Sequence, residues 1–382
     1  MRNPAFEAGR LTSRFSPYVI RVVAICYILS LLAPAPPRVY PEPPQSVLTM
    51  HPLVCAHTRL TDEVEDWKVQ QTLQLVREMG ATTIVELFPW AYIEGQRDAF
   101  DWHHPDRIIE MAHNEGLQVI ARLGIVPAWA RPDPNKQPTT LNYLAPNYYE
   151  AYGEFVAAFA ARYRGKVDRI IPWNEPNLTF EWGDRQVTPE EYVQFLKIVY
   201  QAAHAANPDV IILGGALAPT LEPEDSPVAM NDLAFLRRVL QAGGGASMDA
   251  LAIHTYGFTA PMDDPPSPDK LNFRRFELLI DVMKTFGAEK MPIYITESSW
   301  NDHPRWTNAV TPGQRVEYTL EALRYVEAEW PDVRNLCFWY FRAPTLTRSY
   351  PDYFAFVTPE FRLKPIYEAV QAYARGWKTE VP

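Results

Sequence analysis

Several residue types and patterns are scarce in this 382-residue sequence. Three cysteines are too few for a scaffold built from disulfides. The apolar run from Val22 to Ala33 is shorter than the roughly 20 residues that cross a bilayer as a helix. The net charge is −10, and because residues 1–45 carry five Arg against two Glu (+3), the remainder carries −13. An acidic body without a basic stripe argues against nucleic acid or an anionic membrane surface as a partner.

The motifs of several enzyme classes are missing as well. The sequence has no Gly-x-Ser-x-Gly nucleophile elbow, no phosphate-binding loop and no Gly-x-Gly-x-x-Gly dinucleotide fingerprint. Neither a His-Glu-x-x-His pair nor a Cys-x-x-Cys cluster occurs, so we predict neither a metal nor another cofactor.

The composition that is present is globular and rich in aromatic side chains. Hydrophobic residues make up 47% of the chain and charged residues 21%, which argues against disorder and against a coiled coil. Aromatic residues make up 13%, including 11 Trp and 20 Tyr, which is rich even for a large core. This excess indicates surfaces on which ligands stack.

The N-terminus has the pattern of an export signal. Arginines precede the apolar run, and Ala33-Pro34-Ala35 has the small-x-small pattern of a cleavage site. Pro36 follows directly and disfavours cleavage, so an uncleaved anchor is the alternative. Six prolines between Pro34 and Pro44 then predict a stiff, extended tether.

These features divide the chain into three parts. Residues 1–35 are interpreted as a signal peptide or N-terminal anchor, residues 36–49 as a Pro-rich linker and residues 50–382 as a folded domain. The folded part is generous for one large domain and tight for two. We expect the protein outside the cell or in the cell envelope, either secreted or tethered to the membrane by its N-terminus.

Eight short apolar runs recur along the folded part. They are almost continuously apolar, as expected of parallel strands that are covered on both faces. The runs are Leu53–Ala56, Thr83–Phe88, Gln118–Leu123, Arg169–Trp173, Val210–Leu213, Ala250–Ile253, Ile293–Thr296 and Leu336–Tyr340.

The segments between these runs carry helix signals. Thr61-Asp62-Glu63 is expected to open a helix that Gly80 closes, and Pro365–Ala374 supplies the last helix. Thr188-Pro189-Glu190-Glu191 and Thr311-Pro312-Gly313-Gln314 both have the pattern of a capping box with proline at the first helical position.

Eight strand–helix units predict a (β/α)8 barrel, a single domain that needs about 250 residues. The surplus falls in segments that follow strands, where barrel enzymes place their active sites. An open doubly wound sheet is the alternative, but it calls for a glycine-rich loop where this chain has Ala56-His57-Thr58-Arg59. Cys55 and Cys337 lie in the first and last strands, which are neighbours in a closed barrel. We expect two buried free thiols there, with a disulfide as the alternative.

Two glutamates stand at the ends of strands. The fourth run continues into Asn174-Glu175-Pro176, and the seventh ends in Thr296 and continues into Glu297 and Ser298. A single glutamate in such a position would more simply be a surface residue. Two of them, on strands that lie across the barrel mouth from each other, are expected to face one cavity.

At these residues the sequence resembles the glycoside hydrolases of clan A, the retaining (β/α)8 enzymes. Asn-Glu-Pro after the fourth strand and Thr-Glu after the seventh carry the resemblance, which extends over about residues 50–375. Further motifs fit in order along the chain: Phe88-Pro89-Trp90, Pro127-Ala128-Trp129-Ala130, His254-x-Tyr256, Trp339 and Lys364-Pro365-Ile366-Tyr367. One such motif is weak evidence, but the ordered set is specific.

The resemblance implies a role for each matching residue. Glu175 corresponds to the general acid/base and Glu297 to the nucleophile of a double displacement through a glycosyl ester. Asn174 corresponds to the residue that hydrogen-bonds the sugar 2-hydroxyl. Tyr256 corresponds to a donor that holds Glu297, and Trp339 to the floor of the −1 subsite.

The resemblance places further residues at the sugar-binding face. His254 is expected to orient a carboxylate or to contact the sugar rather than to bind a metal. Trp90 and Trp129 follow strand ends and are expected to stack on sugar rings. Many members of the clan place an arginine near the end of the second strand, where it supports the nucleophile, whereas this chain has Glu86 there. Arg59, after the first strand, is the candidate to supply that charge.

Together these residues predict a retaining glycoside hydrolase that cleaves a β-linked poly- or oligosaccharide without an obligate protein partner. A non-catalytic carbohydrate-binding barrel is the alternative, which the pair Glu175 and Glu297 disfavours because a lectin needs neither an acid nor a nucleophile. A barrel lyase or aldolase would call for a strand-end lysine or a metal cluster, and none of the eight runs offers either.

Overall fold

The computed structural model describes residues 18–19, 21–25, 39, 43–133, 135 and 139–377. The chain divides into two units, Met1–Tyr40 and Pro41–Pro382. Residues 18–19 and 21–25 are helical, and most of the expected signal segment, with its cleavage site, lies outside the described residues. In the described part of the chain, no helix combines the length and the apolarity that a membrane crossing requires.

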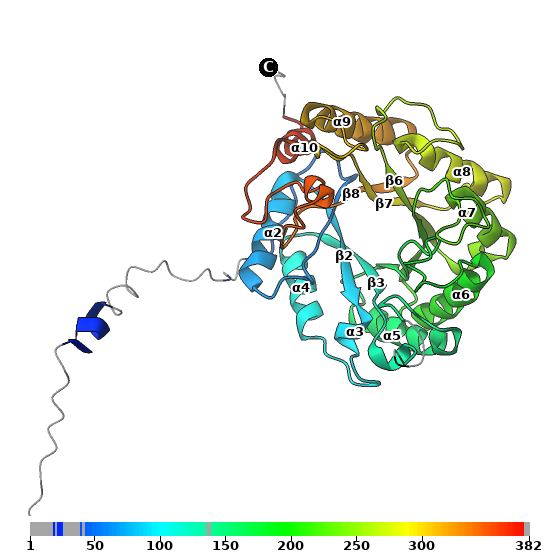
Figure 1. Ribbon diagram of the computed structural model, residues 1–382, viewed down its shortest axis with the longest axis horizontal. Helices are drawn as coiled ribbons and strands as arrows, with labels where there is room; N and C mark the ends of the chain where they lie inside the picture. The colour runs from blue at the N-terminus through cyan, green and yellow to red at the C-terminus, as the bar shows by residue number, and fades with distance from the viewer. Residues whose placement is uncertain are drawn as a thin grey trace, which may run out of the picture. The chain divides into compact units, whose positions relative to one another are not determined.

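The second unit contains a closed barrel of eight parallel strands, which confirms the predicted (β/α)8 fold (Figure 1). The strands follow one another in sequence order around the barrel, and β1 pairs with both β2 and β8. Every predicted run overlaps a strand, and the differences lie at the strand ends. The strands are β1 (Val54–His57), β2 (Thr83–Pro89), β3 (Gln118–Gly124), β4 (Arg169–Ile171), β5 (Ile211–Leu217), β6 (Ala250–Tyr256), β7 (Ile293–Ser299) and β8 (Val333–Phe338).

Helices surround the barrel and cover the outer faces of the strands (Figure 1). The described α-helices of this unit are α2 (Asp66–Met79), α3 (Trp90–Ile93), α4 (His103–Asn114), α5 (Tyr149–Arg162), α6 (Pro189–Ala206), α7 (Asp232–Gln241), α8 (Phe276–Thr285), α9 (Pro312–Glu329) and α10 (Pro365–Arg375). Short 3-10 helices lie in the connections: η1 (Ala128–Ala130), η2 (Pro146–Tyr148), η3 (Gly244–Ser247), η4 (Phe273–Arg275) and η5 (Tyr350–Tyr353). Each strand therefore needs apolar side chains on both faces, one for the helices and one for the barrel interior.

The helix after β1 begins later than the sequence predicts. α2 starts at Asp66 rather than at Thr61. The carboxylate of Glu86 accepts the backbone N–H groups of Leu60 and Thr61, each at 2.9 Å, and holds this stretch as a loop. The end of α2 agrees with the prediction, because Gly80 takes the left-handed conformation (φ 90°) that closes many helices.

One of the two predicted capping boxes forms and the other does not. At the start of α9, Thr311 Oγ1 accepts from Gln314 N (3.3 Å), and Gln314 Oε1 accepts from Thr311 N (3.0 Å). Thr188 is the N-cap of α6, but its side chain makes no capping bond. Glu191, which would complete that box, accepts instead from the hydroxyl of Tyr149 (2.6 Å).

The end of the expected linker already contacts the barrel. Gln45 N donates to the carbonyl of Asn114 (2.6 Å), and Met50 N donates to that of Ala374 (2.7 Å). The side chain of Val47 packs against the hydrophobic core. The contacts of the folded domain therefore begin before residue 50, at both α4 and α10.

Apolar side chains fill the middle of the barrel interior, and we call them the apolar layer. Apart from Tyr294, which is 6% exposed, each of them is at most 1% exposed. Burying one Val, Leu or Ile side chain contributes about 1.5–3 kcal/mol to stability. The layer consists of Cys55, Val85, Ile120, Ile171, Leu213, Ala216, Ala250, Ala252, Tyr294 and Cys337.

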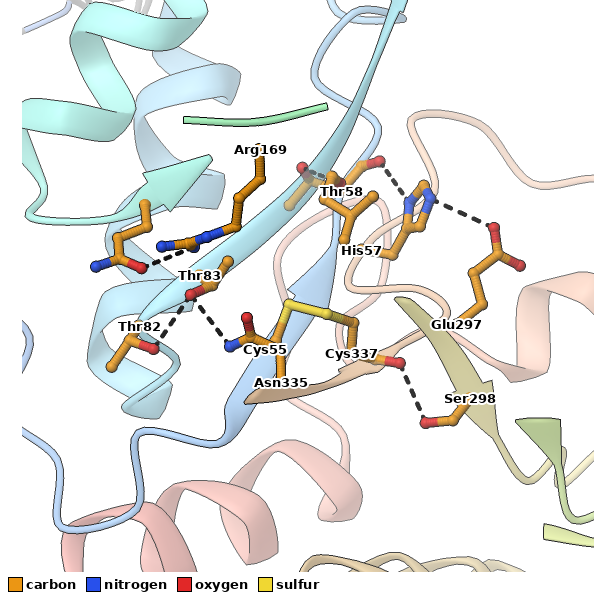
Figure 2. Close-up of a disulfide and its surroundings, with 12 residues drawn as sticks. Cys55, His57, Thr58, Thr82, Thr83, Arg169, Glu297, Ser298, Asn335 and Cys337 are labelled. Atoms are coloured by element: carbon orange, nitrogen blue, oxygen red, sulfur yellow. Dashed lines mark hydrogen bonds and ion pairs between the residues drawn. A yellow bond between two sulfur atoms is a disulfide. The ribbon is translucent and has the colours of Figure 1, made fainter. Parts of the chain in front are cut away.

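Within the apolar layer, Cys55 and Cys337 form a disulfide (Figure 2). The expectation of two free thiols was therefore wrong. The two cysteines are direct partners in the register of β1 and β8, with Cα atoms 4.1 Å apart. Both side chains point into the barrel, so the register that closes the barrel also brings the sulfur atoms together.

One level nearer the carboxyl ends of the strands, the interior becomes polar. Side chains alternate along a strand, so the residue two positions after an inward-facing one also faces inward. Applied to Cys55, Val85, Ile120, Ala252 and Cys337 of the apolar layer, this rule gives the residues that we call the upper layer. They are His57, Leu87, Arg122, His254 and Trp339. Glu297 joins this level because it is the register partner of His254, next to a register shift between β6 and β7.

Candidate active site

The carboxylate of Glu297 lies at the centre of the upper layer and is surrounded by donors. The side chain is 8% exposed. Its Oε1 accepts from Arg122 Nη1 (3.2 Å), and its Oε2 accepts from the hydroxyl of Tyr256 (2.8 Å). His57 Nε2 lies 3.5 Å from Oε1, as Figure 2 shows. The hydrogen bonds from Arg122 and Tyr256 hold the carboxylate in one orientation.

Glu175 reaches the same place from the end of β4. Its backbone is in the left-handed region (φ 43°), a conformation that costs a non-glycine residue about 1–3 kcal/mol. The bond from Glu175 N to the carbonyl of Ala216 (3.0 Å) holds this backbone in place. The side chain is 16% exposed, and its Oε1 accepts from His254 Nδ1 (2.8 Å).

The structure thus brings the two glutamates together, as their positions at strand ends led us to expect. One potential metal-ligand atom from each of Glu175, His254 and Glu297 lies within 4.8 Å of the other two. Such a triad has the geometry of a metal site, but the guanidinium of Arg122 already contacts Glu297 and repels a second cation. The absence of a metal stays a prediction.

The pKa values of the two histidines in the upper layer are shifted in opposite directions from the ordinary value. Burial lowers the pKa of His254, but the carboxylates of Glu297 and Glu175 outweigh it, so the pKa is raised above its ordinary value. Burial and the charge of Arg122 hold the pKa of His57 well below its ordinary value. His57 is therefore neutral near pH 7, and its Nδ1 donates to the carbonyl of Thr58 (3.1 Å). Its Nε2 is then an acceptor, and it has no hydrogen-bond partner among the described residues.

Tyr256 takes the position that the resemblance implied, with its hydroxyl on Glu297. Burial and the nearby carboxylates of Glu297 and Glu175 raise the pKa of Tyr256 well above its ordinary value. The phenol therefore stays protonated and remains a donor.

The arginine at Glu297 is Arg122 on β3 and not Arg59. The guanidinium of Arg59 is 42% exposed and donates to Asp62 Oδ2 (2.7 Å). Arg122 bridges two expected site residues, because its Nη1 also donates to Asn174 Oδ1 (3.0 Å). Arg122 was not among the site residues predicted from the sequence. The signal for it was a basic residue two positions after the inward-facing Ile120, in an otherwise apolar run.

Trp90 is not available to a sugar. Its side chain is fully buried, with its ring against Trp129, Tyr152 and Phe155. Its Nε1 donates to Glu94 Oε2 (2.7 Å). The expectation of stacking was therefore wrong for Trp90, because α3 begins at this residue and turns the indole into the core.

Trp129 and Trp339 keep part of their surface exposed. Trp129 donates to the carbonyl of Glu94 (2.8 Å), and the guanidinium of Arg97 lies 5.2 Å from the centre of its ring. Trp339 meets His57 edge-on, with ring centres 4.6 Å apart, and the Trp339–Tyr340 peptide bond is cis. Stacking of a sugar on either indole stays a prediction.

Two cavities open on either side of Arg122 and Leu87, which line both. One lies at the ends of β1 and β2 and includes His57, Arg59 and Trp339; its volume is about 140 Å³. The other lies at the ends of β3 and β4, includes Asn174 and Glu181, and has a volume of about 80 Å³. The two cavities are therefore neighbours, and Arg122, which lines both, connects them to Glu297.

The sequence also matches known glycoside hydrolases. The model of glycoside hydrolase family 42, described as β-galactosidase, matches residues 61–177, a range that holds Glu175 but not Glu297. The endo-1,4-beta-xylanase A of Xylanibacter ruminicola is 22% identical over 244 residues, which cover 61% of this chain and 59% of the xylanase. The chain thus spans about three fifths of the curated relative that it matches.

Solved structures of similar shape include enzymes of families 39 and 5. A family 39 glycoside hydrolase from Bacteroides cellulosilyticus WH2 has a TM-score of 0.68 at 19% identity, over 88% of this chain and 66% of that one. A monomeric beta-xylosidase from Caulobacter crescentus CB15 has a TM-score of 0.62 at 19% identity, over 86% and 68%. A GH5_18 protein from Streptomyces cattleya, in complex with Manb1-4GlcNAc, has 0.61 at 17%, over 89% and 82%. These identities show the fold, and with the family model they confirm the resemblance to clan A.

Proposed function

We propose that this chain is a glycoside hydrolase that cleaves β-linked glycans with retention of anomeric configuration. The similarity to a β-galactosidase family model, a xylanase and a xylosidase supports glycan hydrolysis. The polar upper layer, at the end of the barrel where such enzymes place their active sites, supports the location of the chemistry.

The separation of the two glutamates carries the proposal. One carboxylate oxygen of Glu175 lies within 4.8 Å of one carboxylate oxygen of Glu297. Retaining enzymes hold their two carboxyl groups about 5–5.5 Å apart, whereas inverting enzymes need about 6.5–9.5 Å to fit a water between them. The geometry therefore favours a double displacement over a single one.

In the first step, Glu297 attacks the anomeric carbon while Glu175 gives its proton to the leaving oxygen. A glycosyl ester of Glu297 forms, and the aglycone leaves as an alcohol. Arg122 and Tyr256 hold the attacking carboxylate in line. In the second step, Glu175 takes a proton from a water molecule as the water oxygen attacks the anomeric carbon; the bond between that carbon and Glu297 breaks, and Glu297 is released as a carboxylate.

Two further residues assist without exchanging bonds with the sugar. His254 donates to Glu175 and lies 3.7 Å from Glu297 Oε2, so it fixes the spacing of the pair. Asn174 is anchored through its Oδ1 by Arg122, and of the two hydrogens on its amide nitrogen one serves Glu181, which leaves the other for a substrate hydroxyl. That nitrogen is the donor for the 2-hydroxyl, a bond that strengthens in the transition state.

We also propose that the enzyme acts outside the cell or in the envelope, on a poly- or oligosaccharide. The basic start, apolar run and Pro-rich segment of residues 1–49 support export. Expression with and without residues 1–35, followed by fractionation of the culture, tests this; secretion that does not depend on the segment contradicts it.

The experiment that tests the function is hydrolysis of a panel of xylo-, galacto-, manno- and gluco-configured aryl β-glycosides and β-linked polysaccharides. Glu297→Ala is expected to abolish turnover. Glu175→Ala is expected to impair natural substrates far more than aryl glycosides, because activated leaving groups need little protonation. Glu110→Ala, which removes a glutamate 63% exposed on α4, is the matched control and should match the wild type.

The anomer formed first, followed by NMR, tests the stereochemistry. A β-configured product supports the double displacement, and an α-configured product contradicts it. Binding of glycans without any turnover would instead favour the non-catalytic carbohydrate-binding barrel. Turnover that survives Glu297→Ala would overturn the assignment of the nucleophile.

A further inference from the structure

The cavity between the ends of β3 and β4 has no role in the mechanism above. It holds a third carboxylate, Glu181, in the segment that follows Glu175 and precedes α6. Its other lining residues include Trp173, which is 2% exposed, and the polar residues Arg122, Asn142 and Asn174. The cavity shares Asn174 and Arg122 with the site around Glu297.

We propose that this cavity is a subsite for the glycone and that Glu181 is its specificity-determining residue, which accepts hydrogen bonds from hydroxyl groups of a neutral sugar. The inference rests on the proposed function, because it requires a glycan bound across Glu175 and Glu297.

Glu181 has acceptor capacity that the protein leaves unused. Its Oε2 accepts from Asn142 Nδ2 (3.1 Å), and Asn174 donates a second hydrogen bond. An ionised carboxylate offers about four lone-pair sites, so two donors leave room for more. Adjacent sugar hydroxyls are donors of the right spacing for one carboxylate.

The charges around the cavity select against an anionic sugar. Besides Glu181, Arg122 from β3 is the charged residue among those that line the cavity, and the carboxylates of Glu175 and Glu297 lie near enough to act on the charge of Glu181. Arg122 already donates to Glu297 and to Asn174. A uronate here would meet carboxylates without a cation of its own among the lining residues that the structure describes, and it would be repelled.

The ionisation of Glu181 responds to pH near neutrality. Burial and the charge of Glu175 raise the pKa of Glu181 to about 7, against the opposing effects of Arg122 and Asn174. Above that pH the side chain is a carboxylate and accepts from hydroxyl groups. Below it the side chain is protonated and loses acceptor strength, so sugar binding weakens as the pH falls through 7.

The test compares Glu181→Gln with the wild type on the best substrate of the panel, from pH 5.5 to 8.5. Gln keeps the shape and removes the charge. Because a hydrogen bond to a charged group contributes about 1.5–3 kcal/mol, KM should rise about tenfold to a hundredfold above pH 7, with kcat within about threefold. The ratio of the two KM values should approach one at low pH, where Glu181 is itself neutral.

Two further variants serve as controls for this experiment. Glu181→Asp keeps the charge and should retain the pH dependence with a smaller loss of affinity, which also serves if Glu181→Gln does not fold. Glu110→Gln removes a glutamate from the surface of α4 and should leave KM unchanged at every pH.

Deoxygenated forms of the product sugar identify the hydroxyl that Glu181 binds. Removal of that hydroxyl should weaken inhibition of the wild type and leave Glu181→Gln unaffected. A constant KM ratio across the pH range, or a loss confined to kcat, overturns the subsite. Turnover that depends on Glu175 and Glu297 but not on Glu181 leaves the proposed function standing and rejects this inference alone.

Discussion

The same strands build both levels of the barrel interior, but the apolar layer contributes to stability and the upper layer to the candidate active site. In the apolar layer, β1, β3 and β8 contribute Cys55, Ile120 and Cys337, which are completely buried. One level higher the same strands contribute His57, Arg122 and Trp339, which surround the carboxylate of Glu297 or line the adjoining cavities. Figure 2 shows the step on β1, from the disulfide to the imidazole that faces Glu297.

This difference separates stability from function along each strand. The lower level gains from burial, and its disulfide ties the first strand to the last. The upper level places a guanidinium, two imidazoles and two carboxylates where water is scarce, which disfavours folding unless each group finds a partner. Variants in the two levels should therefore affect different measurements.

The largest effect is expected from Arg122→Met, which removes the guanidinium from Glu297 and Asn174. Loss of a preorganised donor at the reacting groups lowers rates by about 100-fold to 1,000-fold. We expect a loss of that size in kcat/KM, measured on the aryl glycoside that the wild type cleaves best.

Arg169→Met is the matched control. Arg169 opens β4 at the other end of the barrel, where it donates to Gln118 (2.9 Å) and lies over the ring of Tyr294. Its replacement should leave kcat/KM within about threefold, since nothing at that end touches substrate. An equal loss in both variants would mean that Arg122 acts on the fold rather than on Glu297.

The next effect concerns the disulfide of the apolar layer. The pair Cys55→Ala and Cys337→Val removes the cross-link while it keeps about the same total volume. We expect the free energy of unfolding, measured in urea, to fall by about 2–4 kcal/mol, with kcat/KM at 25 °C unchanged within about threefold.

Reducing agent gives the corresponding result without mutation. Both cysteines are fully buried, so dithiothreitol should leave the folded wild type active and oxidised. The same agent should lower the urea midpoint only once the chain has unfolded in its presence. A rapid loss of activity in the folded state would show that the upper layer depends on the cross-link.

The barrel was predictable because its signals are local. Eight apolar runs and the turns between them fix strand number and order, and the closing of α2 by Gly80 follows from one glycine. The two glutamates were found because each ends a strand in a recognised motif. Their meeting within 4.8 Å then follows from the barrel itself.

The features that were missed depend on register, which no single run encodes. The disulfide requires that Cys55 and Cys337 be exact partners across the seam between β1 and β8. Arg122 required knowing that Ile120 faces inward, because only then does the alternation place the arginine at Glu297. Trp90 was misplaced for a similar reason, since the turn into α3 decides which way its ring points.

The smallest expected effect distinguishes the two histidines of the upper layer. Their contributions to the free energy of unfolding should change with pH in opposite directions. The pKa of His254 is raised on folding, so its stabilisation is complete below about pH 6.5, the ordinary value, and is lost as the pH rises through the folded value. The pKa of His57 is lowered on folding. The contribution of neutral His57 to stability is therefore complete above about pH 6.5 and is lost as the pH falls toward the pKa of His57 in the folded protein.

Urea unfolding of His254→Gln and His57→Gln against the wild type, from pH 5 to 8.5, measures both. The stability of His254→Gln relative to the wild type should improve as the pH rises, and that of His57→Gln should improve as it falls. Each contribution is about 1.4 kcal/mol for every unit by which the folded and unfolded pKa values differ. His113→Gln, at an exposed position on the outer helix α4, is the control. Slopes of the same sign in both upper-layer variants would mean that the carboxylates of Glu175 and Glu297 do not hold a proton on His254.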